Sequence, residues 1–233
     1  MNIRAACLLV LSLPLLAGCR PVLTAHVPVL PTGQALPDGV LPRDLPTGTG
    51  DTLTVTEEVM RIGARYVVSA PSGRVGSIAF QPVQNIPLGR IQVPGGEARA
   101  IYLAQGRVTA AGLERLLRGT RHAKRLAESL ASQGEDGSDE ERYLFAFFAL
   151  MRQGTDAPRL ALVQCGPSHS GQEPIADAVR SRAARRGVRL DGRGELRRLP
   201  GRDLVLEVLA DGLRDAVAAG TCRADMPLQL PDL

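Results

Sequence analysis

Four side chains that could bind a metal recur at every fourth position in the last third of the chain: Cys165, His169, Glu173 and Asp177. Thiolate, imidazole and carboxylate groups are the ligands that zinc takes in proteins, and residues four apart share one face of a helix. The step Gly166-Pro167 breaks such a helix at its start, however, and Cys165 has another cysteine, Cys222, as a partner. The chain has only three histidines in 233 residues. The sequence therefore predicts no metal site here.

The same stretch has the glycine spacing of a phosphate-binding loop. Gly166 and Gly171 stand between an expected strand and an expected helix, which resembles the Walker A motif G-x-x-x-x-G-K-[ST]. Gln172 replaces the lysine that neutralises phosphate charge, and Glu173 replaces the hydroxyl that holds magnesium. We therefore expect no nucleotide hydrolysis and no cofactor. A small-anion site remains open as an alternative to a plain turn, with backbone N–H groups as donors. Its residues would be Gly166, Ser168, His169, Ser170 and Gly171.

Ser168 also has small neighbours two positions away on each side, which resembles the nucleophile elbow of α/β-hydrolases. In that family the serine is followed along the chain by an acid and then by a histidine. The histidines here are His26, His122 and His169, so no distant histidine follows Ser168. A serine hydrolase that uses Ser168 is therefore only a remote alternative, and we assign no catalytic residue.

The N-terminus carries the most specific signal. Arg4 precedes an apolar run, Ala5 to Leu16, that is too short to span a bilayer and is typical of a signal peptide. The run ends in Leu16-Ala17-Gly18-Cys19, which resembles the lipobox of bacterial lipoproteins. The resemblance implies cleavage before Cys19 and acylation of Cys19 with fatty acid such as palmitate. It also implies export to the extracytoplasmic face of the cell membrane or outer membrane. An ordinary secretory signal is the alternative.

The remaining cysteines fit such a location. Cys7 would leave with the leader and Cys19 would be acylated, so the mature chain would keep Cys165 and Cys222. An even pair in an oxidising compartment predicts a disulfide, and two buried free thiols are the alternative.

The chain is basic, with a formal net charge of +4 and 28 basic residues, of which only Lys124 is a lysine. Nucleic acid is not the expected partner, because single-strand binding uses aromatic stacking platforms and this chain has no Trp, three Tyr and four Phe. The arginines could face anionic lipid head groups or acidic envelope polymers. A solvated surface of mixed charge is the simpler reading.

The composition divides the chain into a signal peptide (1–18), a lipid-anchored Pro-rich tether (19–51) and a globular domain (52–233) with a possible sub-boundary near residue 155. Prolines recur along the tether and favour an extended chain. Val27, Val29 and Leu30 could instead pack along the domain as an edge strand.

We expect an α+β fold with an N-terminal β-meander, central helices and a C-terminal α/β segment. In the meander, turns at Pro71-Ser72-Gly73 and Pro94-Gly95-Gly96 each join two strands. Apolar periodicity predicts a helix from Thr109 to Leu130 and a second one from Ser138. The second helix would carry Tyr143, Phe145, Phe147 and Phe148. A strand over 159–165, a helix over 173–186 and a last helix from Asp203 to about Gly220 complete the chain.

The expected function is that of an exported, lipid-anchored envelope protein that acts by binding or assembly rather than catalysis. Its partners would be the membrane, through acylated Cys19, and an envelope protein or polymer.

Overall fold

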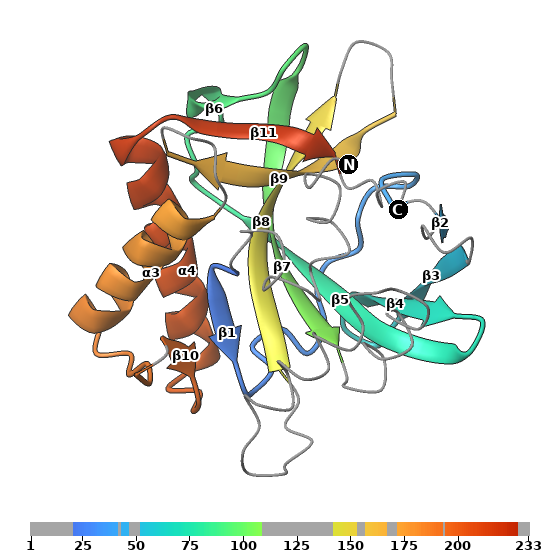
Figure 1. Ribbon diagram of the computed structural model, residues 1–233, viewed down its shortest axis with the longest axis horizontal. Coiled ribbons are helices and arrows are strands. Elements are labelled where there is room, and N and C mark those ends of the chain that lie inside the picture. The colour runs from blue at the N-terminus through green and yellow to red at the C-terminus, as the bar shows by residue number, and fades with distance from the viewer. Residues whose placement is uncertain are drawn as a thin grey trace, which may run out of the picture.

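The computed structural model describes residues 21–41, 43–46, 52–108, 142–152, 157–166, 172–192 and 194–227. Within these ranges the chain forms one mixed, eleven-stranded sheet, with helices α3 (Glu173–Arg185) and α4 (Arg202–Ala219) packed together at its side (Figure 1). The expected α+β arrangement with central helices is wrong, because the described part of the chain is mostly strand and both α-helices belong to its C-terminal third.

The strands are β1 (Leu23–Ala25), β2 (Asp44–Pro46), β3 (Thr52–Val59), β4 (Ala64–Ala70), β5 (Gly73–Val83), β6 (Ile91–Gln92), β7 (Glu97–Val108), β8 (Arg142–Arg152), β9 (Arg159–Cys165), β10 (Glu195–Leu196) and β11 (Cys222–Pro227), and a 3-10 turn spans Leu88–Arg90. Their order is β2-β3-β4-β5-β7-β8-β9-β11-β6, and β1 pairs with β8 and β10 beside this path. The pairs β1–β10 and β11–β6 are parallel, and the others are antiparallel.

Strand β8 replaces most of the second expected central helix. Phe145 and Phe147 face the core beneath α3 and α4, whereas Phe148 faces a second core on the other side of the sheet. A strand that is buried on both faces has apolar residues at consecutive positions, so its sequence resembles that of a buried helix. This ambiguity explains the wrong prediction. The first expected helix, Thr109 to Leu130, lies outside the described residues.

One edge of β8 is shared between two neighbours. β1 pairs with Tyr143 to Phe145, and β9 pairs with Phe148 to Met151. The sheet therefore branches near Phe147, and this branch point lies next to the start of α3.

Much of the expected Pro-rich tether belongs to the fold. Val22, Ala25, Val29 and Leu30 are buried in the core under the helices. The backbone of Gly33 forms two hydrogen bonds with Ala64, and a side chain at position 33 would collide with the backbone of Phe80. The alternative of an edge strand at Val27, Val29 and Leu30 is wrong, because these residues form no strand. The strand in this segment is β1, and it lies between β8 and β10 rather than at an edge.

Several other elements agree with the sequence. The β4–β5 hairpin turns at residues 71–72, β9 spans Arg159–Cys165, and α3 and α4 begin and end within two residues of the expected bounds. The second expected hairpin is wrong, because β6 pairs with β11 and β7 pairs with β5.

Candidate functional site

The loop between β9 and α3 holds the residues for which the sequence suggested chemistry. Gly166 has a positive φ of 107°, and its N–H donates to the Thr221 carbonyl at 3.1 Å. Ser168, His169, Ser170 and Gly171 lie outside the described residues. The anion site therefore stays a prediction, and so does the remote hydrolase reading of Ser168.

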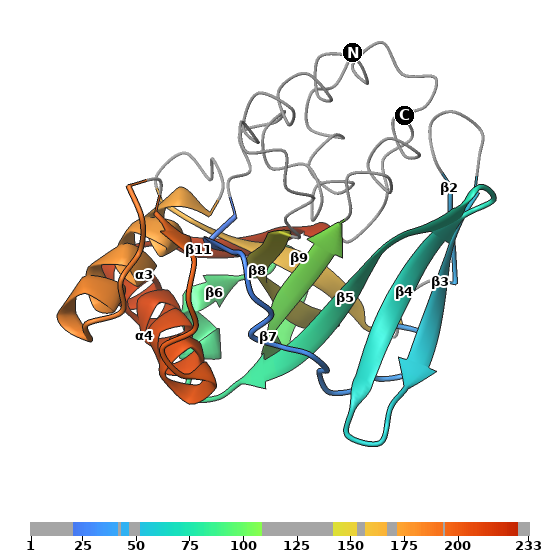
Figure 2. The same cartoon turned by 90° about the horizontal axis from the view of Figure 1, so that it is seen from below.

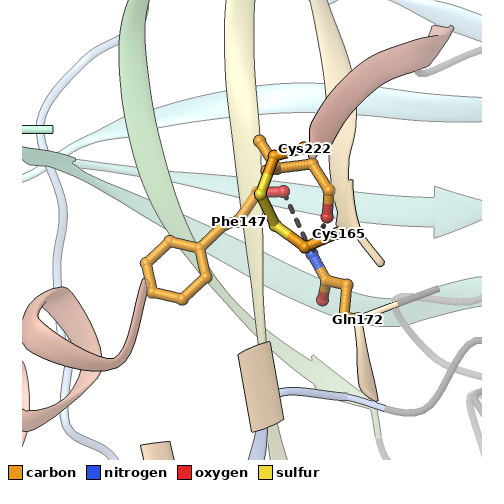
Figure 3. The surroundings of a disulfide bond; sticks show 5 residues. Phe147, Cys165, Gln172 and Cys222 are labelled. Carbon is orange, nitrogen blue, oxygen red and sulfur yellow. Dashed lines mark hydrogen bonds between the residues drawn. A yellow bond between two sulfur atoms is a disulfide. The ribbon is translucent and has the colours of Figure 1, made fainter. Parts of the chain in front are cut away.

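Gln172, at the position of the Walker A lysine, points into the protein. Its side chain is buried, and its amide nitrogen donates to the carbonyls of Phe147 at 3.2 Å and Val163 at 3.0 Å (Figure 3). These two residues lie just beyond the last β8–β9 pair, Phe148 with Leu162, where the strands separate. Gln172 therefore satisfies carbonyls at the branch of the sheet and fixes the start of α3.

Cys165 and Cys222 form a disulfide in the same region (Figure 3). They face each other in the β9–β11 register, with their Cα atoms 4.0 Å apart. Cys165 ends β9 and Cys222 begins β11 directly after α4, and both are buried. The predicted pairing is therefore confirmed. The bond closes the part of the chain that holds both helices.

The sequence predicted no metal site at the four residues spaced by four. Among the described residues, no group of three or more His, Cys, Asp and Glu side chains is placed to hold a metal ion. Of the four residues spaced by four, Cys165 is in the disulfide, and Asp177 forms an ion pair with Arg180 on α3. His26 lies far from this series in sequence and hydrogen-bonds Glu195 at 2.8 Å.

The turn between β3 and β4 is a surface feature that the sequence analysis missed. Val59 is 82% exposed, Ile62 79% and Met60 41%, and the described part of the chain has only one other exposed large apolar residue, Leu199. We call residues 59–62 the apolar turn. Val59 and Ile62 flank Met60 and Arg61, so the turn joins a small apolar surface to a cation. Because exposed apolar patches can mark interaction sites, this turn is the candidate interaction surface among the described residues.

The outer edge of β3 adds backbone groups to this surface. β2 pairs with β3 only at Thr52 to Thr54, and the N–H of Val55 donates to the Arg43 carbonyl. Among the described residues, no strand pairs with this edge beyond Val55. Backbone groups alternate along a strand, so those of Glu57 and Val59 point the same way as those of Val55. They can pair with an added strand.

Comparisons with known proteins give no further guide: no protein-family model, no curated protein and no solved structure matches the chain. In the ranges that the structure describes, neither helix has the length and apolar character needed to cross a bilayer. Cys19 precedes the described residues, so its acylation rests on the sequence motif alone.

Proposed function

We propose that the chain is an exported, lipid-anchored envelope protein that binds a partner through the apolar turn between β3 and β4. Anchoring is supported by the lipobox-like sequence Leu16-Ala17-Gly18-Cys19. The buried disulfide between Cys165 and Cys222 supports export independently, because such bonds persist in oxidising compartments.

The observation that carries the binding function is the exposure of Val59 and Ile62, at 82% and 79%. Such largely exposed β-branched side chains contribute little to the core, and their burial in a contact with a partner would be favourable. The edge of β3 beside them, which no described strand covers beyond Val55, offers main-chain hydrogen bonds to an extended segment. The partner is therefore an envelope protein that presents an extended, partly apolar segment to this edge.

A site-specific photo-crosslinker tests the binding surface in the intact envelope. We expect a crosslinker at Ile62 to give a discrete adduct with one protein, because the apolar turn would be covered in the complex. A matched variant carries the crosslinker at Arg186, which is also exposed but lies at the end of α3. The same adducts from both positions, or none from Ile62, would contradict the proposal.

A further inference from the structure

The distance along the chain from Cys19 to the fold is very short. Val22 is already buried, and its N–H donates to the Phe145 carbonyl of β8 at 2.9 Å. Cys19 precedes Pro21 by two residues. Two residues span at most about 7 Å, so a lipid on Cys19 has no spacer between it and the sheet.

Two neighbours surround the point where the chain enters the fold. The carbonyl of Phe147, two residues along β8 from the Val22 contact, accepts the hydrogen bond from Gln172. β1 runs parallel to β10 with Thr24 opposite Glu195, so the residues before β1 lie at the same end as the turn 191–194. Gly192 in that turn is exposed, and Arg189 just before it is exposed and cationic. Gly192 and Arg189 therefore form part of the surface next to the entry point, whereas Phe147 and Gln172 lie buried beneath it.

The apolar turn lies at the opposite end of the molecule. In Figure 2 the first described residues, in blue, meet the grey trace above the sheet, whereas the turn between β3 and β4 is at the bottom of the view. In this view β3 and β4 run from the upper part of the sheet down to the apolar turn, so their length separates the turn from the entry point.

From the short chain between Cys19 and Val22 and from these positions, we propose that the fold sits directly on the bilayer. The entry point and the turn 191–194 then lie at the lipid surface, and the apolar turn projects away from it. This inference rests on the proposed lipid anchor. It assigns the bilayer to one end of the fold and the protein partner to the other. Arg189 is suited to the lipid end, because a cation near the surface is attracted by anionic head groups.

Fluorescence quenching on vesicles tests the seating. The acylated protein is placed in vesicles that carry a nitroxide on the lipid head group, with a fluorophore on Gly192→Cys or on Ile62→Cys. Both positions are exposed, and a side chain at Gly192 meets no atom within 4 Å. We expect strong quenching of the label at position 192 and none at position 62.

A spacer variant provides the control. A flexible Gly/Ser insert of ten residues between Arg20 and Pro21 spans about 17 Å on average, and should abolish the quenching at position 192. Quenching at position 62, or equal quenching at both positions, would overturn the seating and identify the apolar turn as a lipid contact. Vesicle flotation is measured first, because protein that does not float would contradict the lipid anchor itself rather than the orientation.

Discussion

Gln105 shows how one buried side chain fixes the course of a Pro-rich segment. Its amide oxygen accepts hydrogen bonds from the N–H groups of Val29 and Leu30, each at 2.7 Å. Its amide nitrogen donates to the Leu30 carbonyl at 2.8 Å. Val29 and Leu30 are buried and belong to no strand, so the Gln105 side chain provides the hydrogen bonds that a neighbouring strand would otherwise provide.

We predict that Gln105→Met lowers the free energy of unfolding by about 3 kcal/mol, because three buried backbone groups lose their partner. Urea denaturation of the protein gives the value. Gln34→Met is the matched control, since the Gln34 side chain is exposed and only its backbone bonds the Phe80 carbonyl. Equal stability of the two variants would contradict this role.

The charge of Asp215 on α4 should matter for stability at neutral pH. The hydrogen bond from Arg182, helped by the charges of Arg182, Arg185 and Arg214, holds the pKa of the Asp215 carboxyl below its usual range. Because folding lowers this pKa, the ionised Asp215 carboxylate stabilises the folded protein at any pH above the pKa that it has in the unfolded chain. The stabilisation is lost as the pH falls through the pKa of Asp215 in the folded protein.

Wild type should therefore melt at a higher temperature than Asp215→Asn at pH 7. The difference should shrink below about pH 4, as the carboxyl becomes protonated. Thermal unfolding followed by circular dichroism across this range measures both proteins. A difference that stayed constant down to pH 2 would show that the charge is not the cause.

Residue chemistry was only partly predictable. The disulfide followed from counting cysteines. The absence of nucleotide hydrolysis, argued from Gln172 and Glu173, stays a prediction. Nothing in the sequence revealed that Gln172 turns inward, because its two carbonyl partners become available only where β8 and β9 separate. The exposure of Val59 and Ile62 was also hidden, since apolar residues near a turn usually pack inward.

At the scale of elements, the contact between α3 and α4 depends on a glycine. A side chain at Gly212 would have its Cβ 2.8 Å from the backbone N and Cα of Val179. The Gly212 backbone therefore packs directly against both the backbone and the side chain of Val179, an approach that a Cβ at position 212 would block.

Gly212→Ala should destabilise the protein by about 1–3 kcal/mol, because the helices must move apart, even though alanine is the better helix former. Guanidinium denaturation measures the change. Gly192→Ala serves as the control, because a Cβ there meets nothing within 4 Å. An unchanged or raised midpoint for Gly212→Ala would show that the contact is loose.

The disulfide joins the strands that precede and follow both helices. Cys165 and Cys222 are 57 positions apart, so the bond closes a long loop. In the chain-entropy model a loop of this length contributes about 4 kcal/mol. The double variant Cys165→Ala/Cys222→Ala should lose stability of this order in urea denaturation. Equal midpoints for the variant and the oxidised wild type would contradict that contribution.

The elements that the sequence predicted well are the ones with strong local signals. The β4–β5 hairpin has a clear turn, and α3 and α4 have apolar stripes that face one core. The failures, β8 and the β6–β11 pairing, depend on contacts between distant segments. Local periodicity cannot distinguish a strand buried on both faces from a buried helix.

At the scale of the whole molecule, the main difference from the sequence prediction is that residues 21–46 belong to the fold rather than to a tether. Their prolines suggested a tether, yet β1 pairs with β8 and β2 pairs with β3. Prolines at exposed positions such as Pro28 and Pro31 cost the sheet no hydrogen bonds, so a Pro-rich segment can still line the fold. Without a tether, a lipid on Cys19 would set the orientation of the domain as well as its location.

The central claim is that Cys19 carries this lipid, and metabolic labelling with a fatty-acid analogue tests it most directly. We predict that the wild-type protein is labelled and that Cys19→Ser is not, because no other residue can supply the thiol at the cleavage site. Cys19→Ser should also accumulate as the unprocessed, longer form. Equal labelling of the wild type and Cys19→Ser would contradict the account.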